Sequence, residues 1–148
     1  MNSTNHLITM KKIIQHTFVP VLLLMMVLQA CTDKKEESHK LVKSGIIKLY
    51  QSNYYEALAD FEKSLEYNAE NPEAWYNIGN VYMNLNDYKK AIENYTKAIG
   101  IKEDYADAYY NRGLIKFYMG ERDLACKDWR IAEKYGKKNV DDKTRHCD

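Results

Sequence analysis

The sequence predicts an all-α protein in which three pairs of helices follow one another along the chain. The first observation is a period of 34 residues that separates Gly45, Gly79 and Gly113. The second is that apolar residues inside each period recur at helical spacing. The third is that an alanine set and an aromatic set keep the same 34-residue register: Ala57, Ala91, Ala125 and Phe61, Tyr95, Trp129.

The periods run over 38–71, 72–105 and 106–139, and each predicts two helices. In the second period, apolar residues recur until Asn86-Asp87 interrupts them, and then resume from Tyr88. Glycine on one helix and alanine on the other permit a close approach, and the aromatic residue fills the space beside it. A single pair cannot bury its own apolar face, so we expect the pairs to stack. Residues 140–148 are expected to form a C-terminal cap or tail.

These residues resemble the tetratricopeptide repeat. The second period carries the fullest form of the family pattern: Trp75, Ile78, Gly79, Tyr82, Tyr88, Ala91, Tyr95 and Ala98. The resemblance covers 38–139 and implies three stacked helix hairpins that form a short right-handed superhelix. It also implies a protein that binds other proteins and is not an enzyme.

The first 30 residues are typical of an export signal. Lys11 and Lys12 precede an apolar run over 18–28, which is too short to span a membrane as a helix. The run ends in Leu28-Gln29-Ala30-Cys31, which resembles a bacterial lipobox, so Cys31 is expected to be lipidated and to become the new N-terminus. The alternative is a simple signal peptide that is cleaved elsewhere, with Cys31 incidental.

Residues 31–37 are mostly charged and predict a flexible tether between the lipid and the folded domain. The expected location is therefore the bacterial cell envelope, as a membrane-anchored lipoprotein. Which membrane and which face carry the protein stay open at this point. Whether translation starts at Met1 or Met10 also stays open.

Composition argues against several other functions. The formal net charge is +1, whereas a nucleic-acid-binding protein needs a basic face, so no nucleic acid is expected as a partner. The sequence carries no glycine-rich phosphate loop, no nucleophile elbow and no zinc-protease motif. We therefore expect no enzymatic activity, no cofactor and no bound metal.

The family resemblance implies a concave groove, lined by the first helix of each pair, in which a peptide binds. The groove residues it implies are Tyr76, Asn77, Asn80, Tyr110, Asn111 and Phe117. Tyrosine buries a large ring with one polar tip, and asparagine can donate to and accept from a peptide backbone. The alternative is that these tyrosines pack within the repeats, which we favour for Tyr82 and Tyr109.

Members of the family that bind chaperones hold a C-terminal carboxylate with lysine and arginine at fixed groove positions. The matching positions in this chain are Val42, Ile46, Asn77, Asp107 and Asn111. Only Asn77 agrees with that pattern, and Asp107 has the wrong sign. Carboxylate capture of this kind is therefore not expected.

Two cysteines remain once Cys31 is lipidated, and an exported compartment permits them to pair. Cys126 occupies the place that Leu58 and Ile92 hold in the earlier periods, where it should face the next repeat. If the tail continues the register, Cys147 falls on the glycine position close to the preceding pair. A disulfide there would fix the C-terminal cap; the alternative is a buried free Cys126 beside a frayed tail.

The function we expect is that of a lipid-anchored envelope adaptor that binds another protein or peptide in its groove. One alternative is a structural accessory subunit of an outer-membrane or secretion assembly, which would use its convex face or the end of its stack. Another is a non-catalytic regulator of a cell-wall enzyme. The identity of the partner and the oligomeric state are not predicted.

Overall fold

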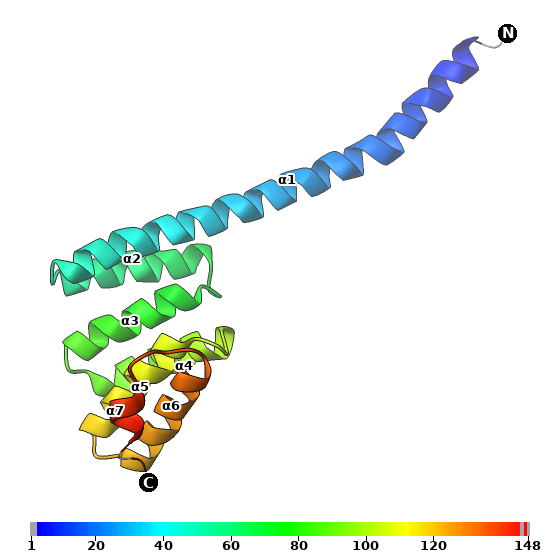
Figure 1. Ribbon diagram of the computed structural model, residues 1–148. Helices are drawn as coiled ribbons and strands as arrows, with labels where there is room; N and C mark the ends of the chain where they lie inside the picture. Colours follow the sequence, from blue (N-terminus) through cyan, green and yellow to red (C-terminus); the bar gives the residue numbers. More distant parts are fainter. Residues whose placement is uncertain (1–2, 146, 148) are drawn as a thin grey trace. The chain divides into compact units, whose positions relative to one another are not determined.

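The protein is described by a computed structural model that covers residues 3–145 and 147 (Figure 1). Among these residues there are seven helices and no strand, which confirms the all-α prediction. The helices are α1 (Ser3–Tyr50), α2 (Tyr54–Tyr67), α3 (Pro72–Asn84), α4 (Tyr88–Ile101), α5 (Ala106–Tyr118), α6 (Arg122–Lys134) and α7 (Asp141–Thr144).

The chain divides into two compact units, Met1–Glu36 and Glu37–Asp148. This boundary falls within one residue of the predicted start of the first repeat. Within the described part of the chain, no helix has the length and apolar character that crossing a membrane requires. The side chain of Cys31, the expected lipidation site, lies outside the described residues.

The expected flexible tether over 31–37 differs from the structure, in which these residues are helical. The physical reason is propensity: Lys34, Lys35, Glu36 and Glu37 are all good helix formers. Extending an existing helix by one residue is also far less costly than starting a new one. Thr32 and the four charged residues that precede Glu37 are exposed, so the segment is helical without being packed in a core.

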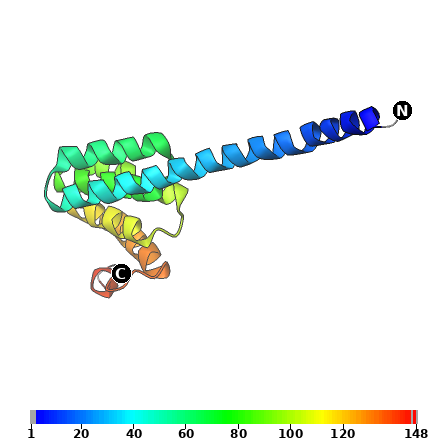
Figure 2. The same cartoon turned by 90° about the horizontal axis from the view of Figure 1, so that it is seen from above.

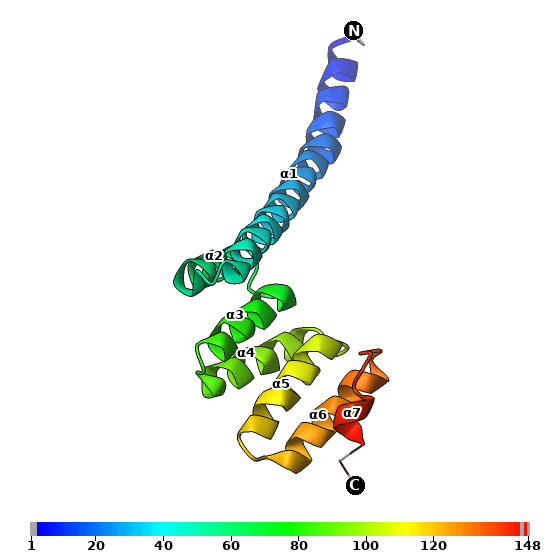
Figure 3. The ribbon, with the colours of Figure 1, turned by 60° about the vertical axis from the view of Figure 1, so that its left-hand side comes forward.

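The second unit consists of three helix hairpins in a stack. The part of α1 from Glu37 onward packs against α2, α3 packs against α4, and α5 packs against α6. Figure 3 shows α3 to α6 as successive layers, with α7 beside α6, and in Figure 2, seen from above, these helices overlap one another. Each hairpin buries its apolar face partly against the next, as stacked repeats must.

The periodic glycines lie where the two helices of each pair come closest. A Cβ atom built on Gly45 would lie 2.5 Å from Phe61, and one on Gly79 would lie 2.6 Å from Tyr95. The equivalent atom on Gly113 would lie 2.8 Å from the indole nitrogen of Trp129. Real Cβ atoms do not come so close, so each crossing requires glycine.

The turns within the hairpins are also periodic. Ser52, Asn86 and Gly120, each 34 residues after the last, all have a positive φ, of 61°, 60° and 82° respectively. Such a backbone favours glycine, and asparagine tolerates it better than most residues do. The start of α3 is fixed differently: the side chain of Asn71 accepts hydrogen bonds from the backbone of Glu73 and Ala74, with proline at the first helical position.

The C-terminal residues form a short cap on the third hairpin. Val140 is fully buried against Ala125 and Trp129, and α7 follows it. Cys126 of α6 and Cys147 are joined by a disulfide, with their Cα atoms 5.5 Å apart. Arg130 adds a hydrogen bond from its guanidinium to the carbonyl of Cys147 at 3.1 Å. The tail is therefore held on α6 by apolar, covalent and polar contacts.

Candidate functional site

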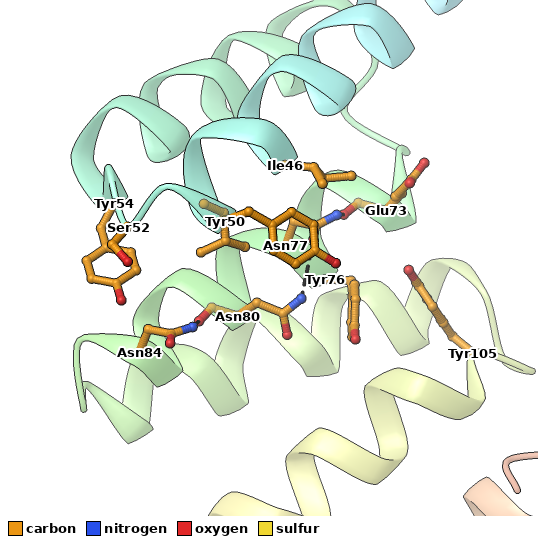
Figure 4. A pocket seen from close by; sticks show the side chains of 11 residues that line it. Ile46, Tyr50, Ser52, Tyr54, Glu73, Tyr76, Asn77, Asn80, Asn84 and Tyr105 are labelled. Carbon is orange, nitrogen blue, oxygen red and sulfur yellow. Dashed lines mark hydrogen bonds between the residues drawn. The ribbon is translucent and has the colours of Figure 1, made fainter.

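A pocket of about 510 Å³ opens between the first two hairpins (Figure 4). Its lining comes from the end of α1, the turn that follows it, one face of α3, and the loop before α5. The lining residues are Ile46, Leu49, Tyr50, Ser52, Tyr54, Glu73, Tyr76, Asn77, Asn80, Asn84 and Tyr105. Tyrosine and asparagine dominate this set, and Glu73 is its one charged member.

Three asparagine side chains form a row along α3. Asn77, Asn80 and Asn84 are three and four residues apart, so they lie on one face of the helix. Asn80 donates to the amide oxygen of Asn77 at 3.3 Å, a contact that Figure 4 shows as a dashed line. Asn77 donates to the carbonyl of Glu73, and Asn84 donates to the carbonyl of Asn80, both at 2.8 Å. The row is thus held in a fixed orientation by its own helix.

Asn111 of α5 links this row to the third hairpin. Its amide nitrogen donates to the hydroxyl of Tyr76 at 3.1 Å and to the amide oxygen of Asn80 at 3.0 Å. The same oxygen of Asn80 also accepts from the hydroxyl of Tyr95 at 2.8 Å. This network joins α3, α4 and α5, and so couples the pocket wall to the stacking of the second hairpin on the third.

The tyrosine rings around the network pack against one another. The ring centre of Tyr76 lies 4.9 Å from that of Tyr105 and 5.7 Å from that of Tyr95. Burial raises the pKa of all three phenols above the ordinary value. Each hydroxyl therefore keeps its proton throughout the physiological pH range, and the one on Tyr76 can donate a hydrogen bond while it accepts from Asn111.

The structure brings together four of the six predicted groove residues. Tyr76, Asn77 and Asn80 line the pocket, and Asn111 contacts two of them. The other two, Tyr110 and Phe117, do not line this pocket.

Tyr110 and Phe117 lie on the face of α5 that packs against α6. Tyr110 is 34 residues after Tyr76 and so has the same place in its own repeat, but it does not line this pocket. The carbonyl of Tyr110 accepts a hydrogen bond from the indole of Trp129, and the ring centre of Phe117 lies 5.6 Å from that of Trp129. The side chain of Tyr110 also carries Lys137 above its ring, at 5.1 Å.

Several lining residues were not among those predicted. Tyr105 precedes α5 and lies in a loop, where helical periodicity cannot predict which way a side chain points. Ser52 lies in the turn after α1, and Tyr54 is the first residue of α2, so neither belongs to the first helices of the pairs, on which the groove was expected. Glu73 is in the first turn of α3, four residues before Asn77. This helical spacing would have been enough to predict that Glu73 lies on the same helix face as the asparagine row.

Family models match two stretches of the chain. The model for the tetratricopeptide repeat matches residues 72–105, which is the second period in full, and a second model, for the TPR repeat, matches residues 45–86. The chain contains tetratricopeptide repeats. No curated protein matches the sequence.

Solved structures of tetratricopeptide domains share the fold. The first such domain of Spaghetti (RPAP3), bound to the HSP90 peptide SRMEEVD, superposes with a TM-score of 0.71 at 21% identity, over 76% of this chain and 91% of that one. The Arabidopsis OM64 TPR domain superposes with a TM-score of 0.72 at 19% identity, over 77% of this chain and 96% of that one. MamA gives 0.63 at 26% identity, over 68% of this chain and 58% of its own.

Proposed function

We propose that this protein is a lipid-anchored adaptor of the bacterial cell envelope that binds a segment of another protein in the pocket between its first two hairpins. The observation that carries the proposal is the lining of that pocket, in which tyrosine rings surround a row of fixed asparagine amides. Such a surface offers apolar area together with hydrogen-bond donors and acceptors.

The length of the amide row suits an extended peptide. Asn77 and Asn84 are seven residues apart on α3, or about 10 Å at a rise of 1.5 Å per residue. An extended chain covers the same distance in about three residues. Amide side chains can both donate to and accept from its backbone, and the exposed ring of Tyr50 can cover its side chains.

The similarity to the HSP90-peptide complex supports peptide binding as the activity, because a domain of the same fold is bound to a peptide in that structure. It does not extend to the same ligand. The positions that match the carboxylate-holding residues of chaperone-binding relatives are Val42, Ile46, Asn77, Asp107 and Asn111, and none of them is basic in this chain. We therefore propose an uncharged segment of the partner, not an acidic C-terminus.

The test is capture of the partner from solubilised envelopes by variants of the pocket. Tyr50→Ala and Asn84→Ala remove lining side chains that are exposed, so neither change should unfold the protein. Both should reduce the recovery of the specific partner several-fold. Tyr55→Ala is the matched control, because Tyr55 is 79% exposed against 87% for Tyr50 but does not line the pocket. Equal recovery by all three variants would contradict the proposal.

A further inference from the structure

A second, smaller pocket lies at the C-terminal end of the stack. Its volume is about 150 Å³, and it is lined by Phe117, Arg122, Cys126, Trp129, Asp142 and Lys143. None of these residues lines the pocket between the first two hairpins. It is formed by the C-terminal end of α5, by α6 and by the short α7.

Phe117, Trp129 and Cys126 form the apolar part of this pocket, and the other three lining residues are charged. The ring centres of Phe117 and Trp129 lie 5.6 Å apart, so the two rings are in contact, and Cys126 is bonded to Cys147. Phe117 is 39% exposed, so part of its ring faces the opening. A cavity of roughly 150 Å³ is large enough to hold a benzene molecule. The pocket therefore has room for one aromatic or branched aliphatic group.

Two positively charged side chains lie beside these aromatic rings. Arg122 and Lys143 each lie over an aromatic ring, Arg122 at 5.8 Å from the centre of Phe117 and Lys143 at 6.0 Å from the centre of Trp129. Neither forms an ion pair with a residue that the structure describes. The one acidic lining residue, Asp142, pairs with Arg145 at 3.4 Å.

We propose that this pocket binds a carboxylate that is attached to an apolar group of about the size of a benzyl side chain. The apolar group packs in the pocket against Phe117 and Trp129, and the carboxylate lies between Arg122 and Lys143. Arginine suits this role because its guanidinium can donate two parallel hydrogen bonds to one carboxylate. The site is independent of the proposed groove function.

The disulfide has a defined part in this site. Arg122 begins α6, whereas Lys143 belongs to α7, a helix of four residues. Such a short helix has little stability of its own. The bond between Cys126 and Cys147 holds the element that carries Lys143 beside the helix that carries Arg122. Loss of the bond should separate the two cations and abolish the site.

The experiment is an NMR titration of the detergent-solubilised full-length protein with N-acetyl-phenylalanine and with its uncharged amide. We expect the acid to shift the indole N–H signal of Trp129 and to bind about tenfold more tightly than the amide, because hydrogen bonds to charged groups are stronger than neutral ones. Equal affinity for acid and amide, or no shift of Trp129 at millimolar ligand, would overturn the proposal.

Three variants locate the binding. The double variant Arg122→Gln with Lys143→Gln should remove the preference for the acid, whereas Lys127→Gln, an exposed residue of α6 outside the pocket, should keep it. Cys147→Ser should weaken binding of the acid to the level of the amide. Retention of the preference in the double variant would also overturn the proposal.

The source of the carboxylate is decided by a third ligand. A heptapeptide that ends in phenylalanine with a free carboxylate should bind much more tightly than N-acetyl-phenylalanine if the natural ligand is the C-terminus of a protein. Equal affinity of the two would identify a free small acid as the ligand. Both results keep the chemistry proposed for Arg122 and Lys143, and a peptide amide that binds equally well would contradict it.

Discussion

The contact between Gly79 and Tyr95 shows how single residues fix the geometry of a repeat. The ring of Tyr95 is fully buried, and its hydroxyl is bonded to Asn80, so it cannot move to make room for a larger residue at position 79. The same tyrosine therefore packs the helix crossing and orients an amide of the candidate site. One side chain thus contributes both to the packing of the helices and to the binding surface.

Gly79→Ala should accordingly destabilise the protein by about 1–3 kcal/mol, as overpacking of a core does. A drop of this size should lower the melting temperature by roughly 5–15 °C. Gly100→Ala is the matched control: an added Cβ there meets no atom within 4 Å, so better helix propensity should leave the stability unchanged or slightly higher. Thermal unfolding followed by circular dichroism measures both, and equal melting of the two variants would show that the crossing is not tight.

Among the elements, α7 depends most on contacts from outside itself. It has four residues, no capping side chain and no buried residue of its own. Val140, immediately before it, and the bond from Cys147 to Cys126 hold it on α6.

In protein isolated from the envelope without reductant, we expect peptide mapping to recover Cys126 and Cys147 as a linked pair. The two cysteines are 21 residues apart in the sequence, and closing a loop of that length should stabilise the fold by roughly 3 kcal/mol. Cys147→Ser should therefore unfold at lower denaturant concentration than the wild type. Recovery of both cysteines as freely alkylated thiols would contradict the pairing.

The faces of α3 and α5 explain which site residues the sequence could predict. On α3, the register predicts Tyr76, Asn77 and Asn80 on one helix face, and all three line the pocket. On α5, Tyr110 has the same place in its repeat as Tyr76, but it lies outside the pocket with Lys137 above its ring, and Phe117 contacts Trp129. The register therefore predicts the helix face of a residue, but not whether a pocket opens beside that face.

For the molecule as a whole, the 34-residue period predicted the number of hairpins and their order. It could not predict Tyr105, because that residue lies in a loop without periodicity. It also could not predict that residues 31–37 are helical, because their charged composition suits both a tether and an exposed helix. At such places the conformation of the chain depends more on the neighbouring structure than on the local composition.

The proposed anchor is also a property of the whole molecule, and it predicts a change of location. Cys31→Ala should move the protein from the membrane fraction to the soluble fraction, because several acyl chains give stable anchoring. Intact-mass measurement of the wild type should show residues 1–30 removed and acyl mass added. A mature chain without acyl groups that fractionates as a soluble protein would contradict the anchor. Cys126→Ala, which removes a different cysteine, is the control and should stay with the membrane.

The central claim is that a partner occupies the pocket between the first two hairpins, and site-specific photo-crosslinking in intact cells tests it most directly. A photoreactive phenylalanine replaces Tyr50, which lines the pocket, or Tyr55, which is exposed outside it. We predict a discrete adduct with another protein from position 50, weakened by Asn84→Ala, and none from position 55. An adduct from position 55 alone, or one from position 50 that Asn84→Ala does not change, would contradict the claim.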